Sequence, residues 1–347
     1  MQFVISADTK KYFSNAQIST NMTPLQFYTQ LLTDIKKAER WCIASVVQTR
    51  GSTPRKTSAQ MAVALDTCGK LIAPIASIGG GAGEAKVLRA AALLLGTLSK
   101  TNESIEIDLS GKAQARSATH TSGVCGGHMR LCLSSFSAPD LHQHVQVICD
   151  ALKAGQTLSI DPVTLLPTAQ NAHESLRLLP TPMCLIGGGG HCGVALAELL
   201  VRLGFPVAVI DERDEVFGCA LSADLEINVF NDWASALALV KNYQAHGTAA
   251  MAVLLSRSYS HDLTALQAIA QSEIAFSLIG MMGSARRIRL VRQELVSYPA
   301  ALLAVLKAPI GLQIGAETPS EIAVSIAAEL LSLRSALAVS SLLSKPN

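Results

Sequence analysis

The chain has 347 residues, of which 49% are apolar and 16% are charged, and this composition excludes an intrinsically disordered protein. The formal net charge is +2 without a basic block, so we do not expect nucleic acid as a partner. The length predicts two or three domains, and the low charged fraction favours an oligomer.

The cysteines and the apolar stretches indicate where the protein works. The eight cysteines are scattered and form no C-x-x-C pair, which is typical of reduced, cytosolic proteins. The first residues lack the charged and apolar segments of a secretory signal. The most apolar stretch, 87–98, contains Arg89 and is too short to span a bilayer. We therefore expect a soluble, cytoplasmic protein with no membrane partner.

The first half predicts a mixed α/β domain over residues 21–137, after an N-terminal arm over 1–20. Thr23 and Pro24 are typical of an N-cap and a first helical position, and apolar spacing continues the helix to about residue 38. A connecting region is expected over 138–180, where prolines accumulate, with a short strand pair near 158–166. Further strands are predicted over 41–49, 61–65, 105–109 and 129–136, with an extended segment over 73–78 and a helix over 83–98.

The second half predicts a Rossmann-like domain over residues 181–345. Apolar strands alternate with helices, which is typical of a doubly wound parallel sheet. Thr318 to Glu321 form a capping-box pattern that opens a helix reaching about residue 333. The expected strands are 183–186, 207–210, 225–229, 250–255 and 276–279. The fold class is therefore α/β, with a mixed domain followed by a parallel sheet.

A dinucleotide-binding fingerprint follows the first strand of the second half. A G-x-G-x-x-G turn there is followed, about 23 residues later, by an acidic residue that could accept from a ribose 2′-hydroxyl. Arg213 could soften the repulsion of a 2′-phosphate by Asp211. Two other interpretations remain open, a Rossmann fold without a nucleotide and a histidine that only caps the helix. The expected nucleotide-binding residues are Gly188, Gly190, His191, Gly193, Asp211 and Arg213.

Four further segments carry candidate binding residues. Cations and hydroxyls in the first suit a phosphate, although a solvated turn has the same composition. The second is a glycine-rich junction at a helix start, where the helix dipole alone would favour a carboxylate. The third places a thiol between glycines, which favours a thiolate suited to molybdenum, copper or a persulfide, although a cysteine is often only a small buried hydrophobe. The fourth begins a basic helix at the end of a strand, where doubly wound folds bind ligands, although an ordinary connection with solvated arginines has the same pattern. Their residues are Arg50, Ser52, Arg55 and Lys56; Gly79, Gly80, Gly81 and Glu84; Cys125, Gly126 and Gly127; and Gly283, Ser284 and Arg286.

Motifs of several enzyme classes are missing. The sequence contains no Walker loop and no G-x-S-x-G elbow. After the fingerprint, His261 with Asp262 is the one adjacent acid–base pair. These absences count against a dehydrogenase built on the fingerprint, although an NAD(P)-dependent oxidoreductase and a pure scaffolding protein stay open as alternatives.

Taken together and in this order, the motifs resemble the XdhC/CoxI family of xanthine dehydrogenase accessory proteins. The resemblance rests on GS-x-P-R at 51–55, GGG-x-x-E at 79–84, CGG at 125–127, G-x-G-H-x-G at 188–193 with D-x-R at 211–213, G-x-x-GS-x-R at 280–286 and PIGL-x-IGAETP-x-EIA at 309–323. One departure is visible, because Ser256 and Arg257 stand where the family often has Thr-His.

The resemblance implies a non-catalytic chaperone of molybdenum cofactor, in its molybdopterin or dinucleotide form. Such a factor protects the cofactor, supports its sulfuration by a cysteine desulfurase, and delivers it to a client molybdenum hydroxylase. We expect a homodimer, with Cys125 contacting molybdenum or handing over sulfur, and the cofactor between the two halves. The glycine turn would bind free NAD(P) or the nucleotide arm of a dinucleotide cofactor.

Overall fold

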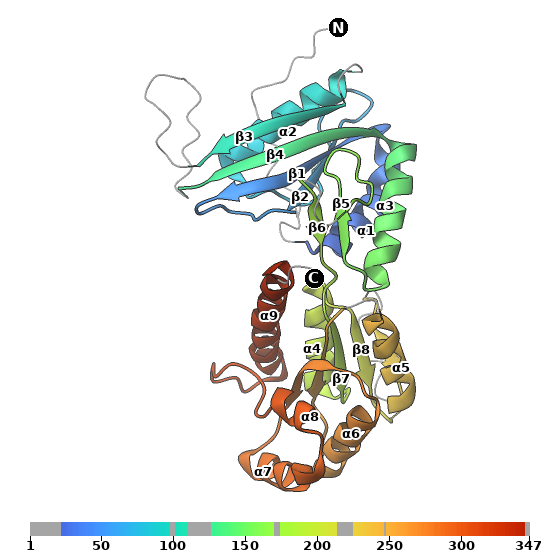
Figure 1. The fold of residues 1–347 in the computed structure, drawn as a ribbon, viewed down its shortest axis with the longest axis vertical. Helices are drawn as coiled ribbons and strands as arrows, with labels where there is room; N and C mark the ends of the chain where they lie inside the picture. Colours follow the sequence, from blue (N-terminus) through green and yellow to red (C-terminus); the bar gives the residue numbers. More distant parts are fainter. Residues whose placement is uncertain are drawn as a thin grey trace. The chain divides into compact units, whose positions relative to one another are not determined.

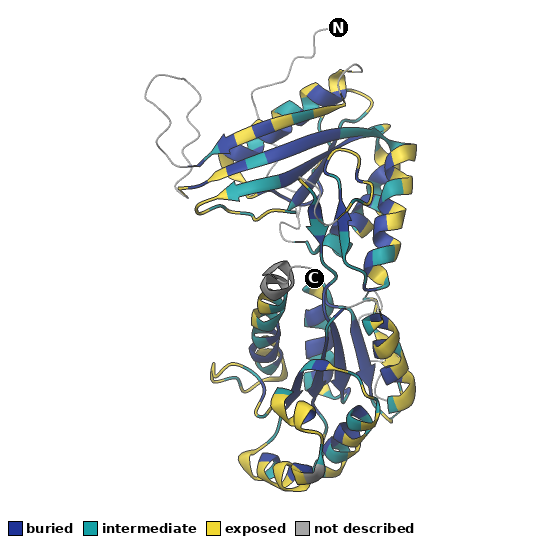
Figure 2. Cartoon of the chain, in the orientation of Figure 1, coloured by how far each residue is buried: buried dark blue, intermediate teal, exposed yellow. Residues whose placement is uncertain are grey.

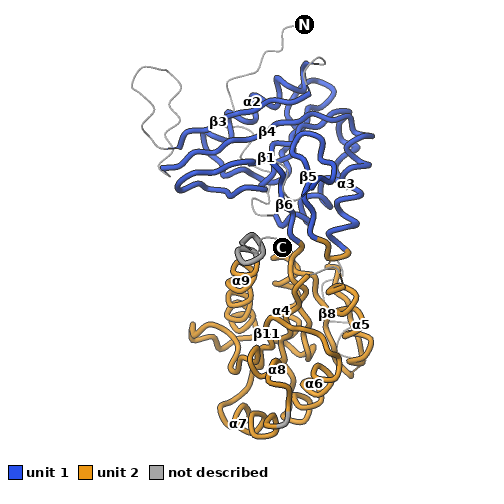
Figure 3. The backbone as a smooth tube through the Cα atoms, viewed as in Figure 1, with its two compact units in different colours: residues 1–153, 157–179 blue, residues 154–156, 180–347 orange. Residues whose placement is uncertain are grey.

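A computed structural model describes residues 22–97, 101–109, 126–169, 174–213, 225–245 and 248–343. The chain divides into two compact units, of which the first holds Met1–Lys153 and Thr157–Leu179 (Figure 3). The second holds Ala154–Gln156 and Pro180–Asn347. Each unit buries its own apolar core, as the dark strands in Figure 2 show.

The first unit is built on an antiparallel sheet with the strand order β2-β1-β4-β3. Its strands are β1 (Arg40–Arg50), β2 (Gln60–Ala64), β3 (Asn102–Asp108) and β4 (His128–Ser137). Side chains alternate between two cores: Trp41 and Ile43 face one, while Cys42 and Ala44 face the other. Helix α2 (Gly81–Gly96) packs in the second core, and α1 (Pro24–Asp34) and α3 (Ala138–Lys153) pack in the first (Figure 1).

Helix α1 begins as its sequence predicts. Thr23 is the N-cap, and its hydroxyl accepts from the Gln26 amide while the Gln26 side chain accepts from the Thr23 amide. The helix ends in a short 3-10 turn, η2 (Ile35–Lys37), which leads into β1. Burial of Tyr28 and Leu31 on its inner face fixes it against α3.

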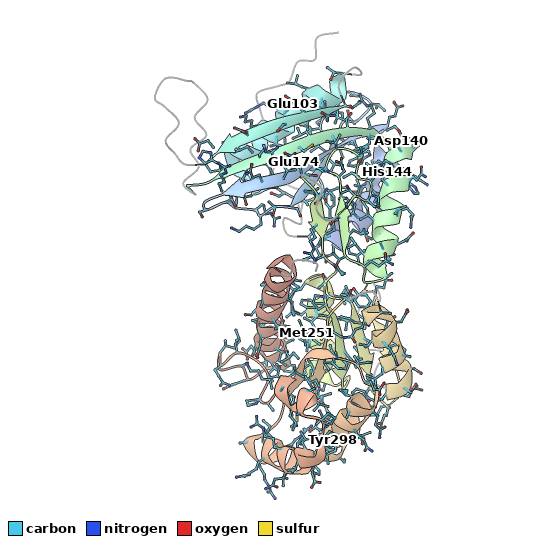
Figure 4. All side chains as sticks on the ribbon, viewed as in Figure 1. Glu103, Asp140, His144, Glu174, Met251 and Tyr298 are labelled. Atoms are coloured by element: carbon cyan, nitrogen blue, oxygen red, sulfur yellow. The ribbon has the colours of Figure 1, made fainter. Side chains whose placement is uncertain are left out.

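The region 138–180 differs from the connection that the prolines predicted. It contains α3, whose buried residues Leu141, Val145, Ile148 and Leu152 recur at helical spacing, and a hairpin of β5 (Leu158–Ile160) with β6 (Leu176–Leu178). The extended segment 73–78 forms no strand but a single bridge, between Ile75 and Ala62. Glu174, labelled in Figure 4, forms an ion pair with Arg130 of β4.

The second unit is a parallel sheet of six strands in its described part, in the order β12-β11-β10-β7-β8-β9. Numbered within the unit this is 6-5-4-1-2-3, the strand order of dinucleotide-binding Rossmann folds. The α/β class with a C-terminal parallel sheet is thus confirmed, and β12 was not predicted. The strands are β7 (Met183–Gly187), β8 (Val207–Ile210), β9 (Asn228–Phe230), β10 (Ala250–Leu254), β11 (Phe276–Met281) and β12 (Leu306–Lys307).

Helices cover both faces of this sheet (Figure 1). On one face α5 (Trp233–Gln244), α6 (Tyr259–Gln271), α7 (Ala285–Glu294) and α8 (Ala300–Val305) pack against alternate strand residues, with the 3-10 turn η3 (Leu295–Ser297) after α7. On the other face lie α4 (His191–Arg202) and α9 (Pro319–Leu343), together with Met251 of β10, labelled in Figure 4. The predicted capping box at Thr318 and Glu321 is confirmed.

Within the described ranges, no helix has the length and apolar character needed to cross a membrane. The six described cysteines are free thiols, while Cys125 and Cys219 lie outside the described residues.

Candidate functional site

Three loops singled out by sequence lie together at one end of the first unit's sheet. A Cβ added to Gly51 would approach the Gly126 carbonyl oxygen to 3.1 Å, and a Cβ on Gly127 would overlap the carbonyl of Ser52. A Cβ on Gly79 would lie 2.5 Å from the Cγ of Pro54. Only glycine allows these approaches. The loops that meet are 50–56, 77–84 and 126–127.

The buried Glu84 side chain fixes the loop 77–84 through hydrogen bonds. One carboxylate oxygen accepts from the Ser77 hydroxyl at 2.5 Å and from the amides of Ile78 and Gly80 at 3.0 Å each. The Arg55 Nε donates to the Ser77 carbonyl at 3.0 Å. Partial burial lowers the pKa of the Arg55 guanidinium, and the nearby Glu84 carboxylate acts against that shift. Glu84 therefore holds the glycine junction in shape rather than facing solvent.

The glycine junction presents an open helix start. Gly80 and Gly81 have φ of +74° and +68°, and a Cβ on either would meet no atom within 4 Å. Gly80 is the N-cap of α2 and supplies no side-chain cap, so the first amides of the helix have no intrahelical partner, and Gly81 and Ala82 are exposed. Exposed cations of the neighbouring loop, Arg50 and Lys56, add positive charge.

Ser52 is exposed beside these cations, and Gly126 is exposed on the neighbouring loop. Cys125, the candidate molybdenum contact, lies outside the described residues. Among the residues that are described, no group of three or more His, Cys, Asp or Glu side chains could hold a metal ion.

In the second unit the glycine turn between β7 and α4 is tightly packed at two of its glycines and open at a third. Gly188 has a φ of +112°, and a Cβ there would lie 2.7 Å from the Leu255 carbonyl oxygen. A Cβ on Gly193 would overlap the Gly188 carbonyl, whereas one on Gly190 would meet nothing within 4 Å. The turn is thus closed on both sides by packing and open at Gly190, where a pyrophosphate would approach. His191 is exposed at the first position of α4.

Asp211 follows β8 and reaches back to this turn. It accepts from the Gly189 amide at 2.8 Å and forms an ion pair with the Arg213 Nη2 at 2.6 Å. Burial raises the pKa of the Asp211 carboxyl, but the hydrogen bonds from Arg213 and from the Gly189 amide outweigh it and hold this pKa at about 2.

A cavity of about 160 Å³ opens beside the turn, at the carboxyl ends of the parallel strands. In a sheet of this order such a crevice is the usual ligand site. Gly187 and Trp233 form one wall of the cavity. The Trp233 ring packs so closely on Gly187 that a Cβ there would lie 2.9 Å from it. The other lining residues are Gly188, Gly190, Ile210, Asp211, Glu212, Arg213, Leu255, Ser256, Arg257, His261 and Ala265.

A buried ion pair under the cavity was not predicted from the sequence. Asp262 has no exposed surface, and it accepts from the Ser256 hydroxyl at 2.6 Å and from Arg287 at 2.5 Å. Arg287 also donates to the carbonyls of Ser256 and Ser258. Burial raises the pKa of the Asp262 carboxyl, while the bonds from Ser256 and Arg287 act against that rise. The residue thus fixes the loop after β10 instead of forming an acid–base dyad, and the Nδ1 of His261 bonds to Ser258.

The fourth predicted segment lies at the carboxyl end of β11. Ser284 is the N-cap of α7, where its hydroxyl accepts from the Arg287 amide, and Arg286 is exposed. Gly283, Ser284 and Arg286 are not among the residues that line the cavity beside Gly188. Arg287 directly follows the motif, and unlike its neighbour Arg286 it is largely buried. Its position next to the motif is the signal that could have found it.

Two family models match the chain. The model described as the XdhC and CoxI family matches residues 35–103, and the XdhC Rossmann domain matches residues 184–330. The first range contains the loops 50–56 and 77–84, and the second contains the glycine turn and the buried ion pair.

Two curated relatives match parts of the chain. A Bacillus subtilis protein, described as a probable component of xanthine dehydrogenase, is 32% identical over 165 residues, which cover 47% of this chain and 46% of that protein. The Escherichia coli protein YqeB, which is uncharacterized, is 27% identical over 303 residues, covering 85% of this chain and 43% of its own length. The chain therefore spans less than half the length of these relatives.

A solved structure shares the fold. The crystal structure of a xanthine dehydrogenase from Bacillus halodurans superposes with a TM-score of 0.67 at 19% identity, covering 90% of this chain and 96% of that one. At this identity the likeness concerns the fold.

Proposed function

We propose that this chain, which belongs to the XdhC/CoxI family, is an accessory factor of a xanthine dehydrogenase-type molybdenum hydroxylase. It would bind molybdenum cofactor, support sulfuration of the cofactor by a cysteine desulfurase, and deliver it to the client enzyme. A homodimer is part of the same proposal. The cofactor is cargo here, carried and then released, so its affinity must stay moderate.

The convergence of the three loops in the first unit is the observation that carries this proposal. Molybdenum cofactor is an anionic pterin phosphate, and the loop cluster offers the kind of donors that hold phosphate: exposed cations and the open amides at the start of α2. Glu84 keeps that junction open without placing its own charge on the surface. Neither a solvated turn nor a helix dipole alone requires glycines of three separate loops to pack this closely against a neighbouring backbone or the Pro54 ring.

Cys125 would contact the metal or pass on sulfur, since it directly precedes Gly126 and Gly127 of this cluster. The test compares Cys125→Ala with Cys68→Ala, a matched removal of a thiol that lies exposed on another turn. Each variant is produced together with the client hydroxylase, and client activity per molecule is measured. We expect loss of activation with Cys125→Ala and full activation with Cys68→Ala. Equal activation by both variants would contradict the role of Cys125.

The open turn at Gly190 supports a nucleotide in the second unit, either free NAD(P) or the nucleotide arm of a dinucleotide cofactor. An NAD(P)-dependent oxidoreductase is the alternative function. This alternative is less well supported, because the Asp262 carboxylate accepts from Arg287 and the Nδ1 of His261 bonds to Ser258. The two residues therefore do not form the acid–base pair that a dehydrogenase could use. Hydride transfer to a substrate panel by the purified protein would favour the alternative.

A further inference from the structure

The carboxylate expected to receive a ribose is already occupied. Asp211 Oδ1 accepts from the Arg213 amide at 3.1 Å and from its Nε at 2.8 Å. Its Oδ2 accepts from the Gly189 amide at 2.8 Å and from the Arg213 Nη2 at 2.6 Å. A carboxylate has about four lone-pair positions, so these four donors fill it. Only 7% of the Asp211 side chain is exposed.

A nucleotide with a free 2′-hydroxyl gains little from such a carboxylate. To donate to Asp211, its ribose must first displace Arg213, which holds Asp211 through two side-chain bonds. That exchange replaces charge-assisted bonds with a hydroxyl bond, and bonds with both partners ionised are the stronger kind. The Asp211–Arg213 ion pair therefore lowers the affinity for a nucleotide whose ribose has a free 2′-hydroxyl.

Arg213 keeps one edge available to an anion. Its side chain is 39% exposed, and its bonds to Asp211 use Nε and Nη2. Within the described part of the chain its Nη1 has no hydrogen-bond partner. Among the described residues that line the cavity, Arg213 and Arg257 balance the two acidic groups, Asp211 and Glu212, so these four side chains carry no net charge.

We propose that Arg213 makes this cavity selective for a nucleotide whose ribose carries a 2′-phosphate, as in NADP, over the same nucleotide with a free 2′-hydroxyl. The phosphate would bind the outer edge of Arg213 while the inner edge stays on Asp211, so no existing bond is lost. A guanidinium presents parallel donors that match phosphate oxygens. The inference rests on the proposed nucleotide site at the glycine turn and names its ligand class.

The test titrates the full-length protein with NADP⁺ and NAD⁺, which differ by the 2′-phosphate alone, using calorimetry with Trp233 fluorescence as a second readout. We expect NADP⁺ to bind about tenfold more tightly or better, the gain typical of a charge-assisted bond. Arg213→Ala should reverse the preference, because it removes the phosphate donor and frees the Asp211 lone pairs. Arg289→Ala, an exposed arginine of α7 outside this cavity, should leave the preference unchanged.

A positional control separates recognition from general attraction of negative charge. Adenosine 2′,5′-bisphosphate should bind more tightly than its 3′,5′ isomer, and equal affinities would overturn the inference. NAD⁺ binding as tightly as NADP⁺ would also overturn it, while leaving the nucleotide site intact. No binding of any of these ligands would remove the nucleotide site itself, and client activation would then test the accessory role separately.

Discussion

Replacing Arg287 by leucine should strongly destabilise the second unit. Asp262 has no exposed surface. Without Arg287, the Ser256 hydroxyl would be the remaining side-chain donor to its carboxylate. Removing one partner of a buried ion pair costs about 3–5 kcal/mol, because the other charge stays buried without compensation. For a unit of this size the melting temperature should fall by on the order of 10 °C.

The loss should depend on pH. Burial raises the pKa of folded Asp262 above its unfolded value, so its contribution to stability is fully present below about pH 3.9 and declines as the pH rises through the folded pKa. Without Arg287 that pKa rises further, since the cation that opposed the shift is gone. The deficit of Arg287→Leu relative to the wild type should therefore widen from mildly acidic to neutral pH.

Thermal unfolding measured by the fluorescence of Trp233, which lies in this unit, is the assay. Arg286→Leu is the matched control, because Arg286 is the neighbouring arginine and is exposed, so its loss should change stability by no more than about 0.5 kcal/mol. Asp262→Asn combined with Arg287→Leu should recover part of the loss. An Arg287→Leu protein that melts like the Arg286→Leu protein at every pH would refute this account of the ion pair.

Three other substitutions and one modification reaction test the remaining geometry. Gly193→Ala should destabilise the second unit by about 1–3 kcal/mol because its Cβ overlaps the turn, whereas Gly190→Ala should fold normally and lose nucleotide binding in calorimetry. Glu84→Ala should cost the first unit about 2–5 kcal/mol in denaturant unfolding, since a buried hydroxyl and two amides lose their acceptor; an unchanged midpoint would contradict this. Burial raises the pKa of the Cys184 thiol to about 12, so in the native protein a maleimide should modify the exposed Cys68 and spare Cys184, as mass spectrometry of the peptides can check.

Local signals predicted much of the fold. Thr23 with Pro24, and Thr318 with Glu321, fixed two helix starts because capping depends on neighbouring residues only. The strands β7 to β11 of the second unit were predicted within a few residues, since buried parallel strands are continuous apolar runs, whereas the two-residue β12 was not. Helix α3 was missed because the prolines around it indicated a connection, although its apolar residues have helical spacing.

The candidate site could be predicted as motifs but not as an arrangement. Sequence singled out the loops 50–56 and 77–84, yet their contact through Pro54 and Gly79 depends on tertiary packing. The same limit explains why Arg287 was missed, since its partner Asp262 lies on another helix. The occupation of Asp211 by Arg213 follows from side-chain conformations that a motif does not specify.

The most direct test of the proposed function is to purify the protein from a host that makes molybdenum cofactor and to measure bound molybdenum together with pterin fluorescence after oxidation. We expect both to be present, and both to decrease when Arg50 and Lys56, the exposed cations of the loop cluster, are replaced by alanine. Protein that activates its client yet copurifies with neither metal nor pterin would contradict the proposed function.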